Sequence, residues 1–289
     1  MKPVDFAGDR VRSEAVEINA VWHCNLGCRS CSHGSPWMPT KEADSEEVHA
    51  DLERLSSVLS VDHVRVLGGE PLLHSNLPEL LRAVKESGIS DKVRMVTNGV
   101  NLESAEADVW MLCDEIHVSV YPNTESRWAR VRPLVQKAAA AHAVRLTAKH
   151  FGFFRESFRV PNGDAALTAR IHATCQIAHR WRCLTAEHGY LYHCPQAAVP
   201  NHREAGDGLH IQSIVGPRQL AEWMLGTRPL SACRSCTGSA GRLHVHTQQR
   251  RGEGTSEMHP SDPVDHLFLS ELERRPDADN GCVVATETF

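Results

Sequence analysis

The sequence contains no run of about 20 apolar residues, so it predicts no membrane-spanning helix. Its first twenty residues carry charges where a signal peptide needs an apolar stretch, which predicts that the chain is not secreted. Basic residues number 31 against 36 acidic ones, and the net charge of -5 gives no electrostatic reason to expect nucleic acid or an anionic membrane as partner. With 41% apolar residues, the chain of 289 residues is typical of a soluble globular protein, which we expect in a reducing cytoplasm.

Cysteine is also too scarce for a disulfide scaffold, because such scaffolds usually exceed about 8% cysteine in a short secreted chain. The ten cysteines are nevertheless grouped along the chain. The groups are Cys24, Cys28 and Cys31; Cys175, Cys183 and Cys194; and Cys233 with Cys236. Only Cys113 and Cys282 stand alone. Clustered cysteines in a cytoplasmic protein indicate metal binding or catalysis.

Strand-like and helix-like segments alternate through the first 150 residues. The predicted strands are Val16–Trp22, Val64–Leu67, Val93–Thr97, Ile116–Val120 and Val144–Ala148. The predicted helices are Ser45–Leu59, Leu77–Ser87, Ser104–Cys113 and Ser126–His142, with Asp44 or Ser45 as the first N-cap and Gly88 as a helix stop. Near-continuous apolar strands alternating with helices predict a parallel sheet. We therefore expect an α/β fold, a partial (βα) barrel, with a doubly wound sheet as the alternative.

Each of these strands runs into an unusual polar sequence. The sequences are HCNLGCRSC after the first strand, GGEP after the second, TNG after the third, YPN after the fourth and KHFG after the fifth. In parallel α/β folds, functional sites are built at the carboxyl edge of the strands. The five strand ends therefore predict one shared site.

The first cysteine group supplies three thiolates, from Cys24, Cys28 and Cys31. A structural zinc site normally closes with four ligands. A four-iron cube held by three cysteines keeps one iron open, and that iron could hold a small chelating ligand. The spacing favours the cluster, with zinc as the alternative.

The combination of CNLGCRSC, GGEP and TNG resembles the radical S-adenosylmethionine (radical SAM) superfamily over about residues 16–150. The resemblance implies that Cys24, Cys28 and Cys31 hold a [4Fe–4S] cluster, whose fourth iron binds the amino and carboxylate groups of SAM. The electron delivered through such a cluster cleaves SAM to a 5′-deoxyadenosyl radical that removes hydrogen from an unactivated C–H bond.

The same resemblance implies the residues that bind SAM. They are Gly68 and Gly69, which let the backbone approach the methionine end, Glu70, which takes its ammonium, Pro71, which stiffens the turn, Asn98 of TNG, and Ser119 near the ribose or methionine. One position departs from the family. The residue before the third cysteine is often an aromatic that touches adenine, and here it is Ser30.

The later cysteines resemble a twitch domain, a shortened SPASM domain that holds an auxiliary cluster, of the butirosin aminocyclitol dehydrogenase type. Cys175, Gly189-x4-Cys194 and Cys233-x2-Cys236 match that pattern. Cys183 competes for a place, because a tight turn at His188-Gly189 would pair Glu187 with Tyr190 and put Cys183 opposite Cys194. A zinc ribbon formed by Cys183, Cys194, Cys233 and Cys236 is the alternative.

Further site candidates follow the last two strands. Tyr121 leaves the fourth strand, and Lys149, His150 and Arg155 follow the fifth, so all four are candidate catalytic or substrate-contacting residues, with an ordinary loop role as the alternative. Cys282 could reach the site only if the C-terminal tail folds over it.

We expect a radical SAM partial barrel over residues 10–160, a twitch/SPASM-like domain over 161–247 and a polar tail over 248–289, much of it mobile or loosely packed. The expected cofactors are SAM and two [4Fe–4S] clusters. A reductase such as flavodoxin or ferredoxin is the expected protein partner, and neither nucleic acid nor a membrane is expected.

The expected function is oxidation of a small substrate, an aminocyclitol, sugar or nucleoside, in natural-product biosynthesis. The auxiliary cluster would accept an electron from the substrate. One alternative is redox-neutral epimerisation, which needs a hydrogen donor such as a spare cysteine or tyrosine. The others are modification of a ribosomally made peptide and a non-catalytic zinc-binding scaffold.

Overall fold

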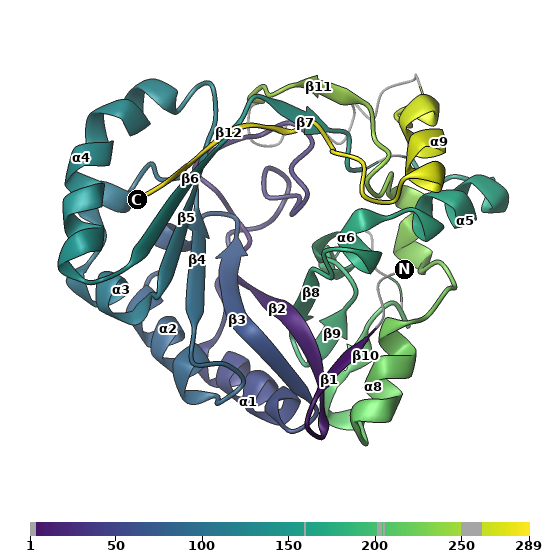
Figure 1. Cartoon of the computed structure of the whole chain (residues 1–289), viewed down its shortest axis with the longest axis horizontal. Helices are drawn as coiled ribbons and strands as arrows, with labels where there is room; N and C mark the ends of the chain where they lie inside the picture. Colours follow the sequence, from purple (N-terminus) through teal and green to yellow (C-terminus); the bar gives the residue numbers. More distant parts are fainter. Residues whose placement is uncertain (1–3, 159, 201–203, 205, 250–261) are drawn as a thin grey trace.

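A computed structural model describes residues 4–158, 160–200, 204, 206–249 and 262–289. Its centre is a set of parallel strands arranged in chain order, as predicted (Figure 1). These strands are β2 (Arg10–Val21), β3 (Leu59–Gly68), β4 (Val93–Thr97), β5 (Glu115–Val120) and β6 (Arg145–Phe151). The open curved sheet is an α/β partial barrel, which confirms the predicted fold class.

Helices cover the outer face of this sheet (Figure 1). They are α1 (Ser45–Ser56), α2 (Leu77–Glu86), α3 (Ala107–Leu112) and α4 (Glu125–Ala141), with 3₁₀ turns η1 (Pro71–Leu73) and η2 (Leu102–Ser104). The Asp44 side chain caps α1 by accepting a hydrogen bond from the Glu47 amide at 2.9 Å. Gly88 follows α2 with a φ of +72°, which glycine adopts without strain. Both boundary signals in the sequence are thereby confirmed.

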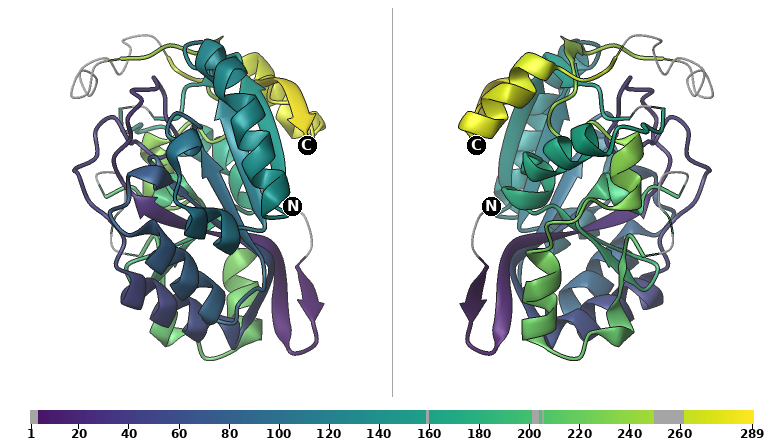
Figure 2. Two further views of the ribbon diagram at one scale, coloured as in Figure 1. Left: turned by 90° about the vertical axis from the view of Figure 1, so that its left-hand side faces the viewer. Right: turned by 90° about the vertical axis from the view of Figure 1, so that its right-hand side faces the viewer.

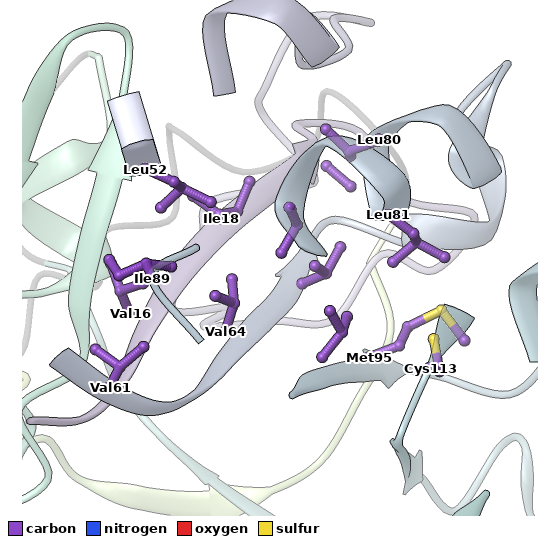
Figure 3. Packing of buried hydrophobic residues seen from close by; sticks show 14 of the residues in the cluster. Val16, Ile18, Leu52, Val61, Val64, Leu80, Leu81, Ile89, Met95 and Cys113 are labelled. Carbon is purple, nitrogen blue, oxygen red and sulfur yellow. The ribbon is translucent and has the colours of Figure 1, made fainter. Parts of the chain in front are cut away.

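The core lies between the sheet and these helices. Figure 3 shows side chains from the strands, such as Val16, Val64 and Met95, packed with Leu80 and Leu81 of α2. Alternate residues of each strand face the barrel interior instead, where Arg65 pairs with Glu17 at 2.6 Å. The interior of the barrel is therefore polar, whereas its outer wall is apolar.

The sheet continues past residue 160. Strand β8 (Leu184–Glu187) runs parallel to β2, and β9 (Tyr190–Tyr192) and β10 (Leu209–His210) follow it antiparallel. Glu187 pairs with Tyr190, and both His188 and Gly189 have positive φ, which confirms the predicted hairpin register. The N-terminal strand β1 (Asp5–Ala7) forms a hairpin with the first residues of β2. Figure 2 shows this hairpin at the bottom of the molecule.

The remaining elements between β6 and residue 249 are mostly short helices and 3₁₀ turns. They are β7 (Phe153–Arg155), α5 (Ala165–Ala173), α6 (Gln176–His179), α7 (Pro195–Ala198), η3 (Ile211–Ser213), α8 (Pro217–Met224), η4 (Ser231–Ser235) and β11 (Leu243–Val245). Strand β11 pairs with β7 to make a separate two-stranded sheet. Within the described residues, no helix is both long enough and apolar enough to cross a membrane.

The C-terminal tail is packed on the barrel, so the expectation of a loose tail is wrong for residues 262–289. Helix α9 (His266–Arg274) buries Phe268, Leu269 and Leu272 against Ile171, and β12 (Val283–Thr288) adds an antiparallel strand to β6 (Figure 1). Three apolar residues on one face of a short helix suffice for docking, although the surrounding composition is polar. Residues 250–261, also part of the predicted tail, lie outside the described residues.

Candidate active site

A cavity of about 370 Å³ lies at the carboxyl ends of the central strands. The ends of β3, β4, β5 and β6 contribute Leu67, Val96, Ser119 and Phe151 to its wall. Segments distant in the sequence complete the wall, including the first cysteine loop and the C-terminal Cys282. The prediction that the strand ends build one site is confirmed.

Cys24, Cys28 and Cys31 all line this cavity, and none forms a disulfide. Burial raises the pKa of Cys24 and of Cys28 to about 12, and the neighbouring thiols add to the shift. The thiols of Cys24 and Cys28 are therefore neutral on their own, and a bound cation would be needed to hold these two as thiolates.

This donor set fits an iron–sulfur cluster. Three unpaired thiols on one cavity wall match the three-cysteine ligation that keeps one iron open. Among the residues that the structure describes, no group of three or more His, Cys, Asp or Glu side chains could hold a metal ion. A four-iron cluster differs from a single ion because each of its cysteines binds a separate iron.

The two glycines of GGEP bring the β3 exit against the cysteine loop. A Cβ at Gly69 would lie 1.8 Å from the His23 carbonyl oxygen, and one at Gly68 would lie 2.4 Å from that of Val21. The Gly69 amide donates to the Val21 carbonyl at 2.8 Å. The glycines therefore allow a close backbone contact between two loops, and both also line the cavity.

Glu70 links the GGEP loop to the TNG loop. Its fully buried carboxylate accepts hydrogen bonds from the Thr97 hydroxyl at 2.6 Å, the Asn98 amide at 2.8 Å and the Leu72 amide at 3.2 Å. Burial raises the pKa of Glu70 to about 7. Glu70 and the buried Pro71 stand behind the residues that line the cavity. That Glu70 binds the ammonium of SAM stays a prediction.

Asn98, Ser119 and Tyr121 line the cavity, and their contacts with SAM or substrate stay predictions. The Asn98 side-chain amide donates to Asn25 at 2.7 Å and lies 3.6 Å from the Cys24 sulfur. Tyr121 is hydrogen-bonded to Ser119, and burial raises its pKa well above the usual value, so the phenol stays protonated. These residues place polar groups beside the three cysteines.

The other candidates near β6 have structural partners. Arg155 lines the cavity, but its guanidinium donates to the carbonyls of Asn280 and Gly241, both at 2.8 Å, and so clamps the tail. His150 pairs with Glu287 of β12 at 2.7 Å and does not line the cavity. Lys149 lies inside the barrel, where burial and the nearby Arg65 lower its pKa. Neither Lys149 nor His150 lines the cavity, which differs from the expectation that they contact the substrate.

Ser30, which replaces the aromatic residue typical of the family, anchors the cysteine loop instead. Its φ is +60°, and its buried hydroxyl donates to Glu156 at 2.7 Å and lies 3.1 Å from His244. Arg29 adds an ion pair to the same carboxylate at 2.5 Å. Serine fits here because the partly buried carboxylate of Glu156 occupies the space next to the loop.

The sequence analysis did not predict several polar residues of the cavity wall, of which three stand out, His33, Ser35 and Gln196. Each has a buried polar side-chain atom without a hydrogen-bond partner: His33 Nε2, Ser35 Oγ and Gln196 Oε1. Such atoms cost free energy unless a ligand or water satisfies them. The residues lie in irregular segments, and only SHGS directly after Cys31 could have drawn attention to two of them.

A second, smaller cavity gathers four of the later cysteines. Cys175, Cys194, Cys233 and Cys236 all line it. Burial raises the pKa of Cys233 to about 12 and that of Cys194 well above its usual value, and the neighbouring thiols contribute to both shifts. These are the four positions of the twitch-like pattern.

Cys183 is not part of this group, contrary to the expectation from the hairpin count. The antiparallel ladder ends at Thr185 and Tyr192, so Cys183 is not held opposite Cys194. Instead its thiol is hydrogen-bonded to Glu17 and Arg65 in the barrel interior. The preceding residue, Arg182, has a φ of +47°, which turns the chain toward the barrel.

The two cavities adjoin. Ile177, Gln196 and Gly238 line both of them. These three residues form a partition that the cavity of Cys24, Cys28 and Cys31 shares with the cavity of the four later cysteines.

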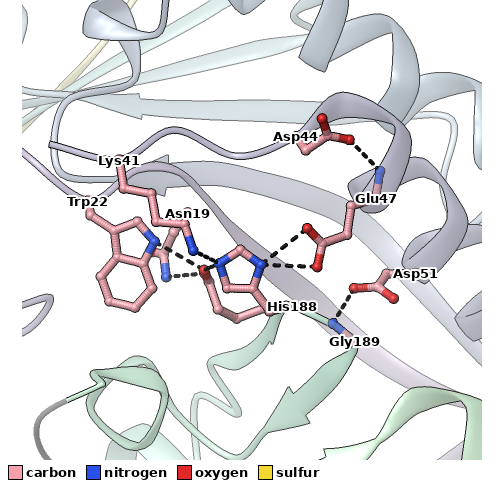
Figure 4. A network of polar contacts seen from close by, with 9 residues as sticks. Asn19, Trp22, Lys41, Asp44, Glu47, Asp51, His188 and Gly189 are labelled. Carbon is pink, nitrogen blue, oxygen red and sulfur yellow. Dashed lines mark hydrogen bonds and ion pairs between the residues drawn. The ribbon is translucent and has the colours of Figure 1, made fainter. Parts of the chain in front are cut away.

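A polar network fixes the β8–β9 hairpin to the barrel (Figure 4). Glu187 accepts hydrogen bonds from Asn19 at 3.0 Å and from the Trp22 indole at 3.1 Å. His188 at the hairpin tip lies 3.0 Å from Glu47 of α1. The hairpin that carries Cys194 beyond its second strand is therefore held at a fixed place beside β2.

Comparison with known proteins agrees with the site. Residues 21–142 match the Radical SAM superfamily. A GTP 3′,8-cyclase of Limosilactobacillus fermentum is 38% identical over 90 residues, which are 30% of this chain and 27% of the relative. One of Mycobacterium tuberculosis is 35% identical over 95 residues, or 26% of its length. The chain thus spans only about a quarter of these curated relatives.

Two solved structures are similar over more of the chain. BtrN in complex with AdoMet and 2-DOIA has a TM-score of 0.47 and 14% identity, covering 78% of this chain and 92% of BtrN. Histidine-tagged anSMEcpe with bound AdoMet has a TM-score of 0.49 and 13% identity, covering 92% of this chain and 96% of that protein. The match with the Radical SAM superfamily spans residues 21–142, the segment that carries the motif residues gathered at the strand ends.

Proposed function

We propose that this protein is a radical SAM enzyme that oxidises a small polar substrate. The observation that carries the proposal is the shared cavity, whose wall contains Cys24, Cys28 and Cys31 together with the ends of β3, β4 and β5. In a parallel α/β fold this is the edge at which reactive groups converge.

The three cysteines would hold a [4Fe–4S] cluster, and the adjoining Gly68, Asn98 and Ser119 would contact SAM. When bound, the reduced cluster and SAM supply a 5′-deoxyadenosyl radical, which takes a hydrogen atom from the substrate. The chain contributes the enclosure. Its tail crosses the barrel mouth and closes the wall with Asn280 and Cys282, which limits access of water to a reactive species.

The cavity supports a small substrate that carries hydroxyl or amino groups. A volume of about 370 Å³ is within the ordinary range of small-molecule sites, whose walls are mostly apolar with a few polar groups. His33, Ser35 and Gln196 supply unpartnered polar atoms on that wall. An aminocyclitol, sugar or nucleoside presents matching groups, and natural-product biosynthesis is the corresponding pathway class.

The substrate of the curated relatives does not transfer to this chain. Their similarity covers about 90 residues, whereas the cavity wall extends from Cys24 to Cys282. No 90-residue segment can contain both ends of that wall. Cyclisation of GTP is therefore not the activity that we propose.

Oxidation of a secondary alcohol to a ketone removes one hydrogen atom, one proton and one electron. The hydrogen atom leaves as part of 5′-deoxyadenosine and the proton passes to solvent, so the electron needs an acceptor. Cys175, Cys194, Cys233 and Cys236 are the residues that would hold an auxiliary [4Fe–4S] acceptor behind the shared partition. A flavodoxin or ferredoxin would supply the electron that SAM cleavage consumes.

Cys282 favours a second candidate, redox-neutral epimerisation. Its thiol lines the main cavity, and burial raises its pKa, so it carries a proton and a transferable hydrogen atom. Return of that hydrogen atom to the opposite face of a substrate radical would invert the centre. The resulting sulfur radical would then need one electron and one proton, with the reductase as electron source.

Product analysis in D₂O distinguishes the two candidates. Oxidation predicts a ketone product, no deuterium at the reacting carbon, and loss of turnover when Cys233 and Cys236 are replaced by alanine. Epimerisation predicts one deuterium at that carbon and loss of turnover in Cys282→Ala. A substrate that reacts fully in both variants would contradict both candidates.

A further inference from the structure

The C-terminal part of the chain pairs directly with the first cysteine loop. We call residues 247–249 the strap. The Arg29 amide donates to the Thr247 carbonyl at 3.0 Å, and the Gln249 amide donates to the Gly27 carbonyl at 2.7 Å. A Cβ at Gly27 would lie 2.0 Å from the Gln249 carbonyl oxygen, so only glycine permits this approach. The strap is thus held against the loop on both sides of Cys28.

Gln248, in the middle of the strap, aims its side-chain amide at the sulfur of Cys28. Its Oε1 accepts a hydrogen bond from the Gly27 amide at 2.7 Å, which can only be donated to an oxygen. That contact fixes which end of the amide is which. The Nε2 group then lies 3.3 Å from Cys28 Sγ, and it also lies 3.4 Å from Asn123 Oδ1 and 3.3 Å from His246 Nε2.

We infer that Gln248 is a positioning residue that tunes the reduction potential of the cluster held by Cys28. The inference rests on the proposed function. A hydrogen bond to a ligand sulfur stabilises negative charge on that sulfur, and reduction adds negative charge to the cluster. Gln248 would therefore raise the reduction potential and ease the delivery of the electron that cleaves SAM.

Because Gln248 lies far from Cys28 in the sequence and on the surface, its effect on the cluster can be measured separately from any effect on folding. Cys24 receives its hydrogen bonds from Leu26 and Asn98, which belong to the cysteine loop and the β4 exit. Cys28 receives its side-chain donor from a residue 220 positions away. Gln248 is exposed, whereas Cys28 is buried, so replacing Gln248 removes its hydrogen bonds with Gly27 and Cys28 without opening the core.

The test uses two glutamine variants of the full chain. Gln248→Met keeps the length of the side chain and removes both the donor to Cys28 and the acceptor of the Gly27 amide, while the backbone hydrogen bonds of the strap remain. Gln249→Met is the matched control, because the Nε2 of Gln249 has no hydrogen-bond partner. Iron content is measured first, and then the midpoint potential is measured by an EPR-monitored titration of the signal that changes when SAM is added.

The inference predicts unchanged iron in both variants, a more negative midpoint potential in Gln248→Met, and no shift in Gln249→Met. Equal potentials in Gln248→Met and the wild type would overturn it. Loss of iron in Gln248→Met alone would also overturn it, because Gln248 would then hold the loop rather than tune the cluster. Wild-type protein that takes up no iron would overturn the proposed function as well.

Discussion

At the scale of single residues, some side chains at the barrel mouth form hydrogen bonds with the backbone of neighbouring loops as well as being candidates for ligand binding. Glu70 illustrates this, because its carboxylate accepts hydrogen bonds from Thr97 and Asn98 of the TNG loop and from the Leu72 amide of its own turn. The sequence motif predicted that Glu70 follows β3. Spacing alone could not show that the Glu70 carboxylate accepts three hydrogen bonds within the protein. Those donors come from backbone and side-chain groups that only the fold brings together.

Glu70→Gln separates the two roles. If Glu70 also binds the ammonium of SAM, loss of a charge-assisted hydrogen bond of about 1.5–3 kcal/mol should weaken SAM binding about ten-fold or more while iron content stays intact. Thr97→Val is the control, because it removes one of the three donors to Glu70 and leaves the charge. SAM affinity is measured by equilibrium dialysis. An unchanged affinity in Glu70→Gln would show that Glu70 is purely structural.

Gln196→Met tests the partition between the two cavities. The Gln196 side chain is 3% exposed and its Oε1 has no partner, so we expect its removal to raise the free energy of unfolding by on the order of 1 kcal/mol. Substrate binding should weaken, because a ligand donor loses its acceptor. Urea unfolding measures the first effect. Marked destabilisation would mean that the amide has a partner in the folded protein.

At the scale of elements, the sequence predicted the alternating strands and helices up to β6 but few of the shorter elements that follow. Alternation of period predicted β2 to β6 and α1 to α4, and the turn at His188-Gly189 predicted the β8–β9 register. The prediction that Cys183 lies opposite Cys194 was wrong, because the ladder ends at Thr185 and a positive φ at Arg182 changes the direction of the chain. The packing of α9 on the rest of the molecule was not predicted, because its apolar face consists of only three residues.

Leu269→Ala tests whether α9 holds the tail in place. Leu269 is fully buried, so its truncation should cost about 2–5 kcal/mol of stability and loosen the connection to β12. Leu267→Ala is the matched control on the same helix, because Leu267 is 86% exposed. Urea unfolding and the rate of Cys282 alkylation are measured. Equal alkylation of both variants and the wild type would contradict a tail that is held by α9.

At the scale of the whole molecule, a polar barrel interior is enclosed by an apolar outer wall. Burial and the nearby Arg94 lower the pKa of His63 and of His117 to about 4, so both are neutral in the folded protein. The unfolded chain, with ordinary histidine pKa values near 6.5, binds more protons below that pH. Stability should therefore fall as the pH drops from about 6.5 to about 4.

Melting temperature measured across that pH range checks this expectation. The double variant His63→Gln, His117→Gln cannot take up these two protons on unfolding, so its melting temperature should fall less steeply with acidification than that of the wild type. Parallel curves for the two proteins would contradict burial of both histidines in their neutral form.

The central claim is that Cys24, Cys28 and Cys31 hold the cluster that cleaves SAM, and the most direct measurement is 5′-deoxyadenosine formation by anaerobically reconstituted protein with dithionite and SAM. The account predicts formation by the wild type and by a Cys175→Ala, Cys233→Ala variant. It predicts none by the Cys24→Ala, Cys28→Ala, Cys31→Ala variant. Undiminished 5′-deoxyadenosine formation by that triple variant would contradict the account.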